Sequence, residues 1–130
     1  MKFIKFRWGS VPDEMKFEDA PGFIKFALGE NVKQSNWGDF ERIRFPQTRM
    51  GVEQVFYDHF HQARDYEQSW KNYNLLSLSE KRRTVAPRED LEMNVLVEIL
   101  NKKRFITCHS YVQSEINMLM KVADSMNFTL

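Results

Sequence analysis

The sequence predicts a single α/β domain over residues 1–130, in which parallel strands are joined by helices. Two short apolar runs, 22–28 and 104–109, have the length of buried strands, and the long segment 48–76 between them repeats apolar residues at helical spacing. A strand, a helix and a second strand in this order form a right-handed crossover between parallel strands. A chain of 130 residues is long enough for one core and requires no second domain.

The N-terminal part of the chain contains two predicted strands. Residues Phe3–Trp8 alternate apolar and charged side chains, which is typical of a strand with one polar face. Residues Gly22–Leu28 form an apolar run that only Lys25 interrupts, and this pattern indicates a buried strand. The polar segment Gly29–Gln47 is predicted to be a long loop, and loops of this length often carry function.

Helical periodicity dominates the middle of the chain. We expect one long amphipathic helix over Thr48–Leu76, because apolar residues recur there at steps of three and four. A charged linker, Ser79–Arg83, separates it from a second helix that is expected to start at Pro87, since proline and the acidic residues after it favour a first helical turn. This second helix is expected to close with Lys102 and Lys103.

The last part of the chain returns to a strand followed by a helix. Arg104–His109 is predicted to be a buried strand, and Ile116–Met126 carries the apolar stripe of a helix. Asn127 suits the left-handed position that closes a helix. Phe128–Leu130 indicates the beginning of a further strand.

Charge and composition exclude several classes of function. The 19 Lys and Arg residues balance 18 Asp and Glu residues without clustering, so nucleic-acid binding is not expected. No apolar run reaches the ~18 residues of a membrane span, and the N-terminus lacks the apolar core of a signal peptide. Any export signal would therefore lie upstream of Met1. Cys108 is the single cysteine, so the sequence predicts no intrachain disulfide and does not indicate a compartment.

Lys25 and His109 are the leading candidates for chemistry. Because side chains alternate along a strand, Lys25 would face away from Ile24 and Phe26, and His109 would face away from Cys108. Both residues lie near the carboxyl ends of their strands, where parallel α/β folds place active sites. The residues alone leave two other interpretations open, a lysine that reaches water from a strand end and a histidine with a structural role.

Two further pairs resemble reactive motifs but do not suit their predicted elements. Cys108 and His109 are consecutive strand residues that face opposite ways, so they are not expected to form a thiol–imidazole dyad. His59 and His61 resemble a metal-binding His-x-His pair, but residues two apart in a helix lie on different sides. We therefore expect a surface or core role for both histidines.

Three segments resemble a known family. They are Pro21–Lys33 (PGFIKFALGENVK), Arg44–Gln54 (RFPQTRMGVEQ) and Arg104–Ile116 (RFITCHSYVQSEI). They are similar to the central part of bacterial metal-dependent amidohydrolases of the imidazolonepropionase-like group. The resemblance implies a partial (β/α)8 TIM barrel that covers about strands 3 to 6. It also implies hydrolysis of an amide, peptide or cyclic amide C–N bond through a metal-bound hydroxide.

The resemblance assigns metal-binding roles to two residues. Lys25 matches a fourth-strand lysine that CO2 carboxylates in many members and that bridges two metals, and His109 matches a histidine ligand on the fifth strand. The implied cofactor is one or two divalent metal ions, usually zinc. After the predicted strand Gly22–Leu28, Arg42, Arg44 and Arg49 could clamp a substrate carboxylate through paired hydrogen bonds, although solvated surface charge is the simpler interpretation.

The family pattern is incomplete in this chain. The family's His-x-His on the first strand, histidine on the sixth and aspartate on the eighth are absent, and a complete barrel takes about 250 residues. We therefore expect a fragment that is inactive alone. Its expected partners are the missing parts of the barrel or further copies of itself, and the complete enzyme would take a small-molecule or peptide-like substrate. The alternative is a non-catalytic standalone α/β module for binding or assembly.

Overall fold

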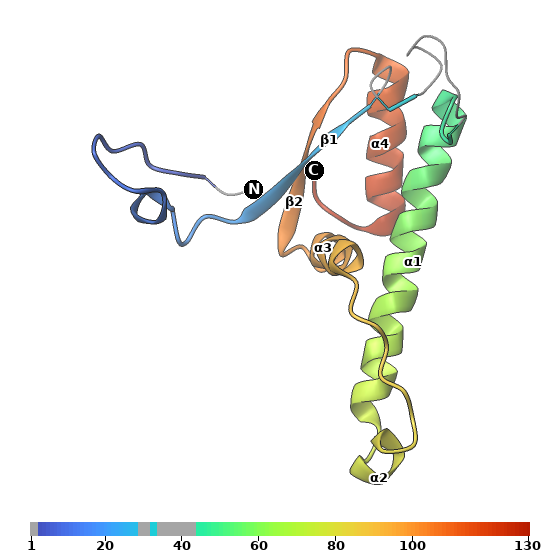
Figure 1. The fold of residues 1–130 in the computed structure, drawn as a ribbon. Helices are drawn as coiled ribbons and strands as arrows, with labels where there is room; N and C mark the ends of the chain where they lie inside the picture. Colours follow the sequence, from blue (N-terminus) through green and yellow to red (C-terminus); the bar gives the residue numbers. More distant parts are fainter. Residues whose placement is uncertain (1–2, 29–31, 34–43) are drawn as a thin grey trace.

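The computed structural model describes residues 3–28, 32–33 and 44–130. Its elements follow the order η1 (Pro12–Met15), β1 (Gly22–Ala27), α1 (Arg49–Leu75), α2 (Leu78–Lys81), α3 (Leu91–Leu100), β2 (Arg104–His109) and α4 (Gln113–Met126). The two strands lie side by side, the helices lie on one side of them, and the N-terminal segment extends away on the other side (Figure 1). This arrangement confirms the predicted α/β class.

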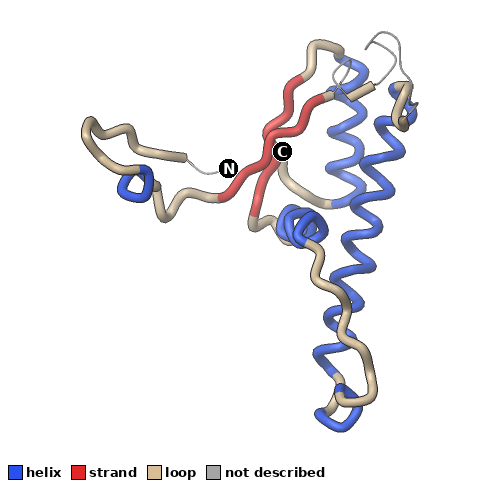
Figure 2. Tube along the Cα trace, in the orientation of Figure 1, coloured by secondary structure: helices blue, strands red, loops and turns tan. Residues whose placement is uncertain are grey.

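The two strands form a parallel pair, as predicted. The register places Gly22 opposite Arg104 and Ala27 opposite His109. The ladder continues for one more bond, because the backbone N–H of Leu28 donates to the carbonyl oxygen of His109 at 3.1 Å. A parallel pair needs a long crossover connection, and the helices between β1 and β2 supply it (Figure 2).

The core lies between the sheet and the helices α1, α3 and α4. Its buried members come from all these elements and from the C-terminal segment: Phe60, Ala63, Leu96, Ile99, Ile106, Val122, Ala123, Met126 and Phe128. A smaller cluster of Leu28, Val52 and Leu119 lies near the carboxyl ends of the strands. Both clusters cover the same face of the sheet. Within the described residues, the other face is therefore open at its carboxyl end.

Helix α1 confirms the long helix that the sequence predicts. Thr48 is its N-cap, since the Thr48 hydroxyl oxygen accepts a hydrogen bond from the backbone N–H of Gly51 at 3.0 Å. Helix α1 buries Val52, Phe60 and Ala63, and the part of the helix after Ala63 extends beyond the sheet (Figure 2). Helix α4 also ends as predicted, because Asn127 adopts the left-handed conformation with φ 58° and ψ 43°.

The prediction that Phe3–Trp8 is a strand of the sheet is wrong. This segment instead folds back on the chain after it: the N–H of Lys5 donates to the carbonyl oxygen of Met15 at 2.8 Å, and Ile4 forms a single antiparallel bridge with Lys16. The alternation of side chains is real, but Trp8 is 92% exposed and has no core to enter among the described residues. A period of two therefore specified an extended segment without specifying its partner.

Several boundaries also differ from prediction. Helix α3 ends at Leu100, before the expected Lys102 and Lys103, and Lys102 has a positive φ of 58°. Helix α3 begins after Asp90 rather than at Pro87. Asp90 is its N-cap, because the Asp90 carboxylate accepts hydrogen bonds from the backbone N–H groups of Glu92 and Met93, at 2.9 and 3.1 Å. The expected linker Ser79–Arg83 contains most of the short helix α2. This helix begins with a capping box formed by Ser77 and Glu80.

Another difference lies at the C-terminal end of the chain. Residues Phe128–Leu130 are not a strand. One hydrogen bond joins them to the sheet, from the N–H of Ile106 to the carbonyl oxygen of Thr129 at 3.5 Å. Most of the predicted loop Gly29–Gln47, including Arg42, lies outside the described residues.

Candidate metal centre at the carboxyl ends of the strands

The sheet register brings Lys25 and His109 together. Lys25 pairs with Thr107 and His109 pairs with Ala27, so the two candidates lie on adjacent parallel strands, two positions apart along the ladder. A strand spacing of ~4.8 Å and a rise of ~3.3 Å per residue place their Cα atoms roughly 8 Å apart. Paired residues of a parallel ladder face the same side, so Lys25 and His109 share one face.

The shared face is the open one. Ile24, Phe26 and Ile106 occupy the opposite face and pack against the helices. Lys25 and His109 are both exposed. The structure therefore confirms the predicted placement of the two side chains, near the carboxyl ends of neighbouring strands and on one side of the sheet.

Aromatic rings line the same face on either side of these two residues. The ring of His109 meets the ring of Tyr111 edge-on, with centroids 4.6 Å apart and an interplanar angle of 83°. Toward the amino ends of the strands, the ring of Phe23 stacks on the ring of Phe105 with centroids 5.7 Å apart, and the ring centroid of Phe3 lies 5.0 Å from that of Phe23. The face is thus apolar at its amino end and carries an amine and an imidazole at its carboxyl end.

Cys108 does not join this group. It lines a pocket on the helix side of the sheet with Leu28, Ile106 and residues of α4. Its thiol contacts the backbone carbonyl oxygen of His109 at 3.9 Å and does not reach the imidazole ring. Burial raises the pKa of the Cys108 thiol above its ordinary value, which disfavours the reactive thiolate. A thiol–imidazole dyad is therefore absent, as predicted.

His59 and His61 form no His-x-His pair. Both lie in α1, where the sequence places them, and they use different neighbours. The Nδ1 of His59 donates to the carbonyl oxygen of Val55 at 2.9 Å, and its Nε2 lies 4.0 Å from the carboxylate of Glu92. His61 is exposed and stacks on Tyr57 at 6.5 Å.

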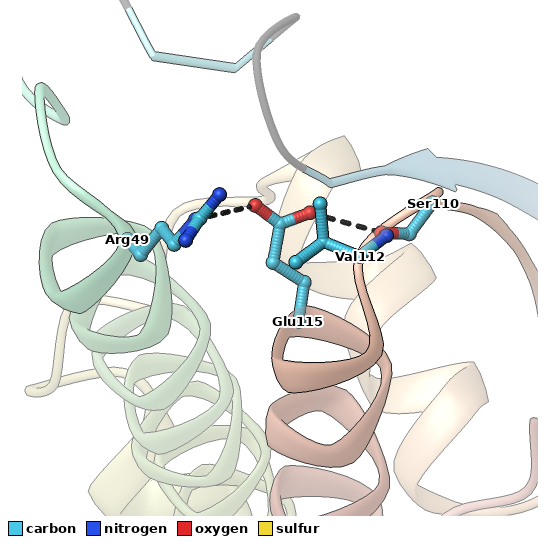
Figure 3. A network of polar contacts seen from close by, with 4 residues as sticks. All are labelled: Arg49, Ser110, Val112 and Glu115. Atoms are coloured by element: carbon cyan, nitrogen blue, oxygen red, sulfur yellow. Dashed lines mark hydrogen bonds and ion pairs between the residues drawn. The ribbon is translucent and has the colours of Figure 1, made fainter.

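A buried carboxylate lies directly behind the carboxyl end of β2. Glu115, the third residue of α4, is only 4% exposed. Its Oε1 accepts a hydrogen bond from Arg49 Nε at 3.1 Å, and its Oε2 accepts one from Ser110 Oγ at 2.9 Å. Ser110 Oγ in turn accepts from the backbone N–H of Val112 at 3.2 Å (Figure 3). This network joins the start of α1, the start of α4 and the turn that follows His109.

No local sequence pattern indicates this network. A capping box places a serine three residues before the glutamate, but Ser110 precedes Glu115 by five residues. The N-cap of α4 is Val112, whose side chain offers no acceptor. The guanidinium of Arg49, a candidate for clamping a substrate carboxylate, donates through its Nε to Glu115. Arg44 is exposed at the edge of a shallow pocket with Phe45, Gln47 and Thr48.

The donor set fits part of a zinc site. Zinc takes imidazole nitrogen and carboxylate-type oxygen, which His109 and a carboxylated Lys25 would provide. The described part of the chain contains no group of three or more His, Cys, Asp or Glu residues that could hold a metal ion. Two donors are fewer than the three protein ligands of a catalytic zinc site.

Comparison with known proteins gives one informative match. No family model matches the chain, and no curated protein does. Among solved structures, the crystal structure of an amidohydrolase from Thermotoga maritima MSB8 is similar, with a TM-score of 0.74 and 31% sequence identity. The match covers 98% of this chain and 30% of the solved chain. Nearly the whole length of this chain is thus similar to an amidohydrolase. The chain spans less than a third of the length of that amidohydrolase.

The comparison supports the amidohydrolase class but does not identify a group within it. The sequence resemblance named the imidazolonepropionase-like group, whereas the solved structure is described only as an amidohydrolase. None of the helices in the described ranges is both long enough and apolar enough to cross a membrane.

Proposed function

We propose that this chain forms the central strands of a (β/α)8 amidohydrolase barrel and that Lys25 and His109 are two of its metal ligands. The observation that carries the proposal is the parallel register of β1 and β2, which places both side chains on one open face near the strands' carboxyl ends. Barrel enzymes build their active sites at these ends. The similarity to the Thermotoga maritima amidohydrolase supports the assignment, and we place the complete protein in the imidazolonepropionase-like group.

Each ligand has a distinct part in this proposal. The Lys25 amine would react with CO2 and lose a proton, which gives a carbamate with two oxygen donors. His109 would offer a neutral ring nitrogen, as histidine ligands do. A bound divalent ion, usually zinc, supplies Lewis acidity and lowers the pKa of water. Within the described residues, the sheet face is open toward its carboxyl end, so an amide, peptide or cyclic amide substrate would approach from that side.

Arg44 and Arg49 are the candidate substrate-binding residues. Arg44 is exposed, and the Arg49 side chain is about half exposed beside Glu115. Arg49 already donates through Nε, so it would hold a substrate carboxylate through its two Nη groups. Arg44 would add a second donor from the segment before α1.

Metal analysis of the complete protein tests the proposal. The coding region on both sides of this segment is read first, because a His-x-His upstream and a histidine and an aspartate downstream are expected. The complete protein is then purified as wild type and as Lys25→Ala, His109→Ala and His61→Ala. We expect the first two variants to lose bound metal and amide hydrolysis, and the His61 variant, which changes an exposed helical histidine, to keep both.

Two results would contradict the proposal. One is full metal content in both the Lys25 and the His109 variants, which would remove these residues from the metal site. The other is a coding region without the additional histidines and aspartate, which would favour a standalone binding or assembly module. The isolated 130-residue chain is expected to show no metal-dependent hydrolase turnover, since two donors do not complete a catalytic site.

A further inference from the structure

The turn between β2 and α4 depends on a carboxylate rather than on a conventional helix cap. The N-cap residue Val112 has no side-chain acceptor, so it makes no capping hydrogen bond to the backbone N–H groups in the first turn of α4. Ser110 Oγ accepts the N–H of Val112, and Glu115 Oε2 accepts the hydroxyl hydrogen of Ser110. The conformation of the turn is therefore linked to the position of one buried carboxylate.

Two features fix that carboxylate in turn. Arg49 Nε donates to Oε1 of Glu115, so a second element, α1, holds the side chain from the other side. Glu115 also lies in the first turn of α4, where the helix dipole favours a negative charge. At 4% exposure, Glu115 is shielded from water and cannot exchange these donors freely for solvent.

The turn carries the residue that meets the candidate metal ligand. Tyr111 is 88% exposed, so burial does not determine its position. Its ring nevertheless meets the imidazole of His109 edge-on at 4.6 Å. The place of Tyr111 must therefore follow from the backbone of the turn, which Ser110 and Glu115 hold. Hydrogen bonds run from Arg49 through Glu115 to Ser110, and the next residue, Tyr111, contacts the ring of His109.

We propose that Glu115, acting through Ser110, is a positioning residue for His109. The pair fixes the turn that presents Tyr111 to the imidazole, and the ring of His109 is thereby oriented on the open face before any metal binds. The inference rests on the proposed function for its purpose, since an oriented imidazole is useful to a metal site. Its structural content concerns this chain alone and can be tested without metal.

Nuclear magnetic resonance of the metal-free 130-residue chain tests the inference. Samples with labelled His and Tyr rings report nuclear Overhauser effects between the rings of His109 and Tyr111, and a His109→Gln sample assigns the signals. The variants Ser110→Ala and Glu115→Leu are expected to lose these ring contacts. Ser110→Thr, which keeps the hydroxyl, is expected to retain them.

A matched control and a fold readout accompany these variants. Ser114→Ala changes an exposed neighbouring serine of the same helical turn and should keep the contacts between His109 and Tyr111. Core contacts between Phe60 and Phe128, whose ring centroids lie 4.6 Å apart, should persist in every variant. Retention of both readouts supports an intact fold, against which a selective loss at His109 is meaningful.

Several outcomes overturn the inference. Full ring contacts in Ser110→Ala or Glu115→Leu would mean that the turn does not depend on the pair, and loss in Ser110→Thr would mean that the hydroxyl is not the cause. Simultaneous loss of the core contacts would assign the pair a general structural role. Failure of the proposed function looks different: the complete protein would keep its metal without His109, while the ring contacts of the metal-free chain would still depend on Ser110 and Glu115.

Discussion

Replacing Glu115 by alanine should loosen the start of α4 selectively. The substitution removes the hydrogen bond from Ser110 to a buried carboxylate, and bonds to charged groups contribute roughly 1.5 to 3 kcal/mol. The ion pair with Arg49 adds at most about 1 kcal/mol, because the arginine side chain is 54% exposed and screened by water. We therefore expect local stability to fall by about 1.5 to 4 kcal/mol, which corresponds to roughly 10- to 700-fold more frequent opening.

Amide hydrogen exchange measured by mass spectrometry detects this change at low protein concentration. The relevant amides are those of residues 115 and 116, which both donate to the carbonyl oxygen of Val112, at 3.0 and 3.1 Å. Their exchange rates should rise by the factor above, since exchange follows the opening equilibrium. Glu53→Ala is the control, because Glu53 lines the same pocket as Glu115. Equal exchange in the two variants, or a rise of less than about threefold for Glu115→Ala, would refute the reasoning.

Three further predictions concern the core, the pH dependence and self-association. Phe60→Ala should cost about 3 to 5 kcal/mol in thermal unfolding because the ring is 1% exposed, whereas His61→Ala on the same helix should stay within about 0.5 kcal/mol; similar losses would be inconsistent with this core. The pKa of Glu67 is lowered below 4.5, chiefly by a side-chain hydrogen bond from Asn101. The stability that this carboxylate contributes is therefore present above pH 4.5 and is lost as the pH falls through the lowered pKa. Glu67→Gln should reduce the loss of melting temperature in acid, and an unchanged loss would argue against the link. Finally, sedimentation should reveal concentration-dependent self-association that Trp8→Ser weakens, because this side chain is 92% exposed; a monodisperse wild-type monomer would count against it.

The sequence was sufficient for the elements whose signals are local. The apolar run that contains Lys25 and the run that ends at His109 became β1 and β2, and alternation along each strand correctly assigned both residues to one face. The helical periodicity of Thr48–Leu76 became α1 within one residue at each end. These features depend on neighbours within a few positions, so one sequence was enough to find them.

Features that depend on distant partners could not be predicted in the same way. The bond between Arg49 and Glu115 joins residues 66 positions apart, and no local pattern distinguishes this glutamate from a solvated one. The alternation of Phe3–Trp8 gave a period but no pairing partner. Pro87 and Asp90 both suit a helix start, and side-chain hydrogen bonding at Asp90 decided between them. The metal-binding roles of Lys25 and His109 came from a family resemblance and remain a proposal.

The measurement that tests the central proposal most directly is a crystal structure of the complete protein with an anomalous diffraction map at the zinc edge. The proposal predicts a zinc peak at the carboxyl ends of β1 and β2, with His109 nitrogen and a carbamate oxygen on Lys25 each at about 2.0 to 2.2 Å. A zinc peak held by other residues, with the Lys25 amine unmodified and His109 turned away, would contradict it.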